Sequence, residues 1–123
     1  MKKMALALAA ISAVALGGAA FAQDACVRPA APSVADGATA TVDQLMASKT
    51  AVAAFIADSD KYQSCLVDGV TAQRAAAKAA KTKFDESIAK GVTGKIKENQ
   101  ADKEATGKSF NAAVKAYKAA HPT

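Results

Sequence analysis

Histidine is almost absent from this chain, and tryptophan is missing altogether. The one histidine, His121, stands two residues before the last residue, on a segment where a helix would fray. A Ser-His-Asp or Cys-His nucleophilic site needs a well-placed imidazole, so we expect neither. No glycine-rich phosphate loop follows a strand, because no strand pattern is apparent. We therefore expect a protein that is not an enzyme and takes no cofactor.

Metal-binding patterns are also missing. The two cysteines, Cys26 and Cys65, are 39 residues apart, which fits neither a CxxC redox motif nor a zinc site. Asp58, Asp60 and Asp68 lack the glycine and the terminal glutamate of a calcium loop. These aspartates are more typical of a solvated helix face, and we expect no metal.

Bulky apolar residues are scarce. Residues 23–123 hold 16 Leu, Ile, Val and Phe residues in all, against 25 alanines. This is too little for a comfortable globular core. The same residues carry 14 basic and 11 acidic side chains, a net charge too low for a typical disordered chain. Because alanine is the strongest helix former, the composition predicts long, thinly packed helices.

The first 22 residues read as an export signal. Lys2 and Lys3 precede an apolar run, and Ala20-Phe21-Ala22 is a small-x-small cleavage pattern. An uncleaved anchor is the rival interpretation, because 19 uncharged residues approach the length of a membrane span. Asp24 argues against a lipoprotein acylated at Cys26. We expect a periplasmic or secreted protein with a Sec-type signal at 1–22, an arm at 23–41 and a helical domain at 42–120, and such a compartment lets Cys26 pair with Cys65.

The arm and the first helix have clear sequence signals. Pro29, Pro32 and Gly37 interrupt any helix before residue 41. Thr41 and Gln44 form a capping box, so a helix should begin at residue 42. An apolar stripe then recurs at helical spacing to about residue 67: Leu45, Val52, Phe55, Ile56, Tyr62 and Leu66.

The spacing of the cysteines predicts how the arm runs. Cys65 lies about 35 Å along a helix that begins at residue 42. The 15 residue steps from Cys26 to Thr41 span at most ~50 Å when extended. The arm can therefore run back antiparallel along the first helix, with the disulfide fastening it. We expect Val27, Pro29, Pro32 and Val34 to cover apolar surface there.

The second half leaves two architectures open. One has helices at 71–90 and 95–120, with a turn at residues 91–94. Gly107 is either tolerated inside the last helix, at a cost of about 1 kcal/mol relative to alanine, or marks a break with Ser109 as the next cap. The other merges the first two segments through Gly69 into one long helix. The expected fold is therefore all-α: an elongated antiparallel helical hairpin or a three-helix bundle, with an extended N-terminal arm held to the first helix by a disulfide. Phe110, Val114 and Tyr117 should pack inward in either case.

Several short motifs together resemble a known group of proteins. They are Cys26-Val27 with Pro29 and Pro32, then Asp60, Tyr62, Cys65 and Leu66, then Phe110-Asn111 and Tyr117-Lys118. The chain resembles a family of small exported Gram-negative all-helical proteins of unknown function, with a Cys-x-x-Pro arm and a second cysteine in the first helix. The resemblance implies paired cysteines and an all-helical fold, and it offers no established activity to carry over. The Lys-rich stretch at residues 78–108 departs from that family.

Charge is unevenly distributed. Residues 23–68 carry three basic and six acidic side chains, whereas residues 69–123 carry eleven basic and five acidic ones. Packing of complementary halves is one explanation, and a basic binding surface is the other. The lysines that could contact an anionic partner are Lys95, Lys97, Lys103, Lys108, Lys115 and Lys118.

Three functional hypotheses follow. The first is a non-enzymatic periplasmic helical protein that binds an unknown envelope component or associates with itself, because the amphipathic helices exceed what one core can bury. The second is a binder of anionic lipid or polysaccharide at the membrane surface through the lysines above. The third is a holdase-like periplasmic chaperone. Export argues against a nucleic-acid partner.

Overall fold

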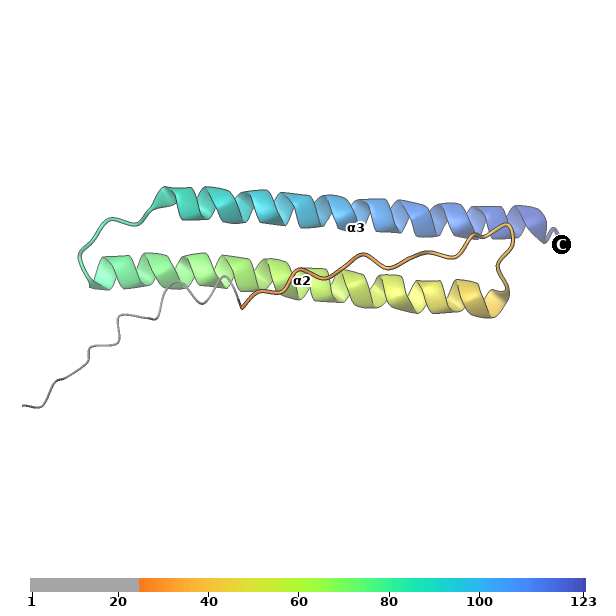
Figure 1. Cartoon of the computed structure of the whole chain (residues 1–123), viewed down its shortest axis with the longest axis horizontal. Helices are drawn as coiled ribbons and strands as arrows, with labels where there is room; N and C mark the ends of the chain where they lie inside the picture. Colours follow the sequence, from red (N-terminus) through yellow and green to blue (C-terminus); the bar gives the residue numbers. More distant parts are fainter. Residues whose placement is uncertain (1–24) are drawn as a thin grey trace, which may run out of the picture.

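The protein is a two-helix antiparallel hairpin with an extended arm lying along it (Figure 1). The computed structural model describes residues 25–123, so the segment expected to be a signal peptide lies outside the described residues. Helix α2 spans Val42–Ala79 and helix α3 spans Glu86–Ala120, which makes them about 57 and 52 Å long. The hairpin prediction is confirmed, and the three-helix alternative is wrong.

The start of α2 follows the predicted capping box. The backbone N–H of Gln44 donates to the Thr41 hydroxyl at 3.2 Å, and the Gln44 side chain accepts from the Thr41 N–H at 2.9 Å. These two bonds satisfy amides that have no partner within the helix. The helix then continues through Gly69, which is buried, to Ala79. Gly69 is therefore tolerated inside the helix, as the merged-helix alternative requires.

The connection between the helices lies earlier than the predicted turn at residues 91–94, and that prediction is wrong. The chain turns at residues 80–85, where Lys81 adopts a positive φ of 54° and the Thr82 N–H donates to the Ala77 carbonyl at 2.9 Å. Asp85 then caps α3 by accepting from the Ser87 N–H at 3.0 Å. The segment predicted as one helix over 71–90 is interrupted here, because Asp85 restarts the helix.

Contacts across this turn hold the two helix ends together. Arg74 of α2 donates two hydrogen bonds to the Glu86 carboxylate, at 3.0 and 2.8 Å. Its guanidinium also lies 4.6 Å from the centroid of the Phe84 ring. A forked pair of this kind fixes orientation better than a single contact does. The closure of the hairpin thus depends on side chains that are 12 residues apart in the sequence.

Helix α3 is continuous through Gly91, Gly94 and Gly107, so of the two alternatives at Gly107 the glycine tolerated inside the helix is confirmed and the break is not. Glycine within a helix costs about 1 kcal/mol relative to alanine, which is a weak local preference. Packing along α2 outweighs it, since Val92, Asn99, Thr106 and Ala113 of α3 are all buried. Tertiary contacts thus carry the helix across positions that would favour a turn in isolation.

The disulfide between Cys26 and Cys65 is present, with a Cα–Cα distance of 5.7 Å. The arm runs antiparallel to α2, as predicted, and it also lies along α3, which the sequence did not predict (Figure 1). Pro29, Pro32 and Val34 are half-buried. Val27 is 80% exposed, so its predicted covering role is wrong. The side chain next to the disulfide points to solvent, whereas the prolines face the helices.

The apolar core is small and is interrupted by polar groups. The buried part of the predicted α2 stripe consists of Val52, Phe55, Tyr62 and Leu66, and Val92 joins it from α3. Polar side chains are buried beside it: Ser48, Ser59, Asn99 and Thr106. Phe110, Val114 and Tyr117 are half-buried. The helices are therefore joined along a mixed seam rather than a continuous apolar one.

Neither α2 nor α3 contains a stretch apolar enough to cross a membrane, and this finding applies to residues 25–123.

Candidate functional site

The six candidate lysines do not form one surface. Lys103 turns toward α2, where its ammonium group pairs with the Asp60 carboxylate and its side chain is only 17% exposed. Lys95 and Lys118 are exposed, but they lie on opposite flanks of α3 at 100° per residue. Lys97, Lys108 and Lys115 remain, and they share one side of the helix. The structure thus divides the six predicted lysines into three that point outward, two on the flanks of α3 and one, Lys103, that points inward.

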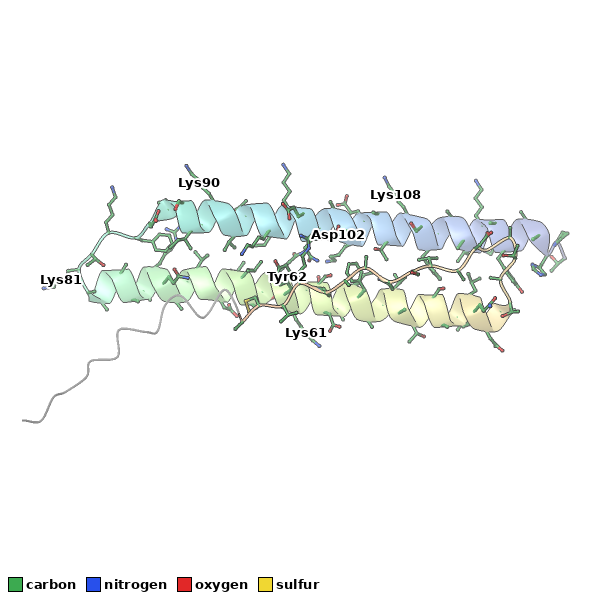
Figure 2. All side chains as sticks on the ribbon, viewed as in Figure 1. Lys61, Tyr62, Lys81, Lys90, Asp102 and Lys108 are labelled. Carbon is green, nitrogen blue, oxygen red and sulfur yellow. A yellow bond between two sulfur atoms is a disulfide. The ribbon has the colours of Figure 1, made fainter. Side chains whose placement is uncertain are left out.

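Lys90 belongs with the three outward lysines, although the sequence-based selection omitted it. Steps of 7, 11 and 7 residues join Lys90, Lys97, Lys108 and Lys115, and each step is close to a whole number of helical turns. All four are exposed. Figure 2 shows Lys90 and Lys108 pointing away from α2. We call these four residues the lysine edge. It extends about 37 Å along α3.

The 7-11-7 spacing could have revealed this edge in the sequence. It did not, because the predicted turn at residues 91–94 placed Lys90 on a different helix from the other three lysines. When the turn is placed at residues 80–85 instead of 91–94, Lys90 lies on the same helix as the other three lysines and joins the candidate site. The error came from treating two glycines as a break when the helix continues through them.

Most acidic side chains of α3 form ion pairs with basic residues that do not belong to the lysine edge. Arg28 of the arm donates to Glu98 at 2.9 Å and to Asp102 at 2.6 Å. The hydrogen bond with Asp102, more than any other contact, raises the pKa of Arg28, with smaller contributions from Glu98. Glu86 pairs with Arg74 across the turn. Glu104 lies five turns from Glu86 on the same side of α3 and, unlike Glu86, has no ion-pair partner in residues 25–123, so the edge keeps about three net positive charges.

The four edge lysines themselves lack counter-ions. Within residues 25–123, no carboxylate forms an ion pair with any of them; the ion pairs of this region involve Arg28, Lys61, Arg74 and Lys103. Between the lysines stand small residues that are also exposed: Gly94, Ala101, Ala105, Ala112 and Ala119 face the same side or border it. An external surface can therefore approach the edge closely.

A buried polar cluster sets the position of α3 against α2. The Asn99 amide group donates to the Ser59 hydroxyl at 3.1 Å, and the Gln63 amide donates to the Asn99 carbonyl oxygen at 2.8 Å. Asn99 and Ser59 are fully buried. Because unpaired polar groups are unfavourable in such a position, sliding or rotating either helix would break these bonds. The cluster therefore fixes which side of α3 faces outward.

Other candidate chemistry does not assemble in the described part of the chain. His121 is exposed and stacks on Tyr117, with ring centroids 4.2 Å apart. Asp58 pairs with Lys61 and Asp60 with Lys103. No group of three or more His, Cys, Asp or Glu side chains in residues 25–123 is arranged to hold a metal ion. The lysine edge is the surface whose chemistry most clearly suggests a ligand.

The disulfide has a bearing on where the protein folds. Structural disulfides are typical of proteins that fold in oxidising compartments.

The chain matches no protein-family model, and comparisons with curated proteins and with solved structures found no significant match.

Proposed function

We propose that this chain is a non-enzymatic periplasmic protein that binds an anionic component of the cell envelope through the lysine edge of α3. The observation that carries the proposal is the alignment of Lys90, Lys97, Lys108 and Lys115 on one exposed side, where no carboxylate of residues 25–123 pairs with them. A row of like charges that is not neutralised within the protein attracts a complementary external field.

The rigidity of the hairpin supports this proposal. The disulfide fastens the arm to α2, while Arg28, two residues further on, pairs with two carboxylates of α3. The first residues of the arm thus connect both helices. Lysines on an ordered helix meet a surface together, so less conformational freedom is lost on binding than for lysines on a loose tail.

Pelleting with isolated envelope membranes tests this function. We expect the oxidised protein to pellet with the membranes at low ionic strength and to be released at high salt, because salt screens exposed charges. A variant with glutamine at all four edge positions should stay in the supernatant. A matched control carries glutamine at four exposed lysines away from the edge, Lys49, Lys61, Lys78 and Lys81.

Because both variants lose four positive charges, comparing them separates the effect of net charge on binding from the effect of where the lysines lie. Retention of the control with loss of the edge variant is the expected pattern. Equal retention of the two variants would contradict a binding edge, and so would pelleting that salt does not change. Circular dichroism and thermal melting show that both variants keep the helical fold.

Self-association is a second candidate, favoured by a different observation. Val42, Met46 and Val67 are each at least half exposed, and all three lie on one flank of α2 at helical spacing. Val42 and Met46 are one turn apart, and Val67 lies about 31 Å farther along the same flank, so a partner helix lying along this flank would contact all three. Sedimentation equilibrium over a wide concentration range would reveal an oligomer that a Val67→Gln, Met46→Gln variant loses, whereas a monomer at every concentration excludes it.

A further inference from the structure

We propose that the lysine edge binds a layer of anionic lipid headgroups, on which α3 lies flat while α2 is held away from the surface. This inference rests on the proposed function and names its partner. It concerns the kind of surface that fits the edge and the orientation of the bound protein.

The shape of the edge favours a flat partner over a linear polymer. A polysaccharide chain is usually held in a groove that surrounds it, whereas the lysine edge is the convex side of one helix. Four hollows of residues 25–123 lie elsewhere, and their linings include Val67, Ile96 and Cys65 but none of the four edge lysines. A straight convex row about 37 Å long contacts a plane along its whole length.

The side chains around the edge determine the depth of binding. Residues that border the lysines are small, namely Gly94, Ala101, Ala112 and Ala119. The large apolar side chains with the greatest exposure in the described residues belong to the arm and to α2: Val27, Val42, Met46 and Val67. Insertion into acyl chains requires bulky apolar groups on the face that meets the membrane. The edge lacks them, so binding is confined to the headgroups.

Charge on the opposite side of the molecule supports the same orientation. Asp43 and Asp68 of α2 are exposed and lie 25 residues apart, close to seven turns, so they share one face. That face is opposite the buried residues Ser59 and Leu66 and therefore points away from α3. An anionic surface attracts the lysine edge and repels these aspartates, which sets the roll angle of the hairpin.

Energy transfer from single tryptophans tests this orientation, because the natural chain has none. Ala101→Trp places the probe on the edge between Lys97 and Lys108, and Ala57→Trp places it on the far face of α2. The two probes differ by about 20 Å in height above the surface, which is two helix diameters. The acceptor is a headgroup-labelled lipid in vesicles of phosphatidylglycerol and phosphatidylcholine. We expect strong transfer from the first probe and weak transfer from the second.

The pair Ala112→Trp and Ala54→Trp repeats the comparison at two other positions on the same two faces, in case a first substitution disturbs folding. Lipids brominated near the ends of the acyl chains should quench none of the probes, because a single tryptophan on the edge reaches no deeper than the boundary between headgroups and acyl chains. Each edge lysine changed to glutamine should weaken vesicle binding about fivefold, and all four together several-hundredfold.

Each other outcome overturns the inference in a distinct way. Equal transfer from both faces contradicts the orientation, and quenching by these brominated lipids contradicts headgroup binding. Binding to envelope membranes and to soluble dextran sulfate, without binding to phosphatidylglycerol vesicles, identifies a polyanion chain as the partner and leaves the proposed function standing. Failure to bind envelope membranes at all removes both proposals.

Discussion

Gly37 of the arm packs directly against the backbone of Ala113 in α3. A Cβ atom at position 37 would lie 1.8 Å from the Ala113 carbonyl oxygen. Two residues earlier, the Ala35 N–H donates to the Ser48 hydroxyl of α2 at 3.0 Å. The turn at the end of the arm therefore touches both helices, and it does so at the end of the hairpin far from the disulfide.

Replacing this glycine tests how tightly the arm is seated. Gly37→Ala should destabilise the protein by about 1–3 kcal/mol, because neither backbone can yield without separating the arm from α3. Gly94→Ala is the matched control: its Cβ would meet nothing within 4 Å, and alanine favours a helix, so a gain of about 0.5–1 kcal/mol is expected. Urea unfolding followed by circular dichroism measures both. Equal stability of the two variants would mean that the arm is not tightly packed.

The disulfide should contribute a large share of the stability. Closing a loop of 39 residues stabilises by about 4 kcal/mol in the chain-entropy model. We expect the double variant Cys26→Ser, Cys65→Ser to melt at a markedly lower temperature than the oxidised protein. The wild-type protein kept in a reducing agent should match the variant. Unchanged melting in both cases would show that the other arm contacts suffice.

The buried polar cluster should behave as a coupled unit. Asn99→Ala leaves Ser59 and Gln63 without their partner and should cost about 1–3 kcal/mol. A double-mutant cycle with Ser59→Ala should give a coupling energy of at least about 0.5 kcal/mol. Asn111→Ala on the exposed side of α3 is the control, with an expected change within about 0.5 kcal/mol. Strict additivity of the two cluster variants would rule out a shared hydrogen-bonded unit.

The cap of α3 predicts a dependence of stability on pH. Hydrogen bonds from Ser87, first from its side chain and then from its backbone N–H, lower the pKa of Asp85. A carboxyl group whose pKa is lower in the folded state stabilises that state above its unfolded pKa of about 3.9, and the effect is lost as pH falls through the folded value. The melting temperature of the wild-type protein should therefore exceed that of Asp85→Ala at pH 7, and the difference should shrink below about pH 4. A difference that stays constant down to pH 2 would argue against an ionised cap.

Local signals in the sequence were sufficient where one short motif determines the structure. Thr41 and Gln44 define the start of α2 because capping needs only residues within one turn of each other. Cys26 and Cys65 could be paired because the compartment suggested by the first residues and the reach of the arm left few alternatives. Val27 was misplaced, since an extended segment gives no periodicity that tells an inward from an outward side chain.

The position of the turn and the register between α2 and α3 could be determined only from the tertiary structure. Gly91 and Gly94 resemble a turn locally, but helix packing over the length of α3 outweighs a cost of about 1 kcal/mol each. The polar stretch around Asn99 gave no sign of burial, because its partners Ser59 and Gln63 lie 40 and 36 residues away.

The lysine edge shows most clearly which features the sequence determined and which only the tertiary structure decided. The sequence alone determined that basic residues would gather in the second half of the chain and that the helices would be long and thinly packed. Only the folded hairpin decided that Lys103 turns inward to Asp60 while Lys90 joins Lys97, Lys108 and Lys115 outside. The physical reason is that the direction of a side chain depends on helix continuity and on contacts with a distant segment, and neither is a property of the residue's own neighbours in the chain.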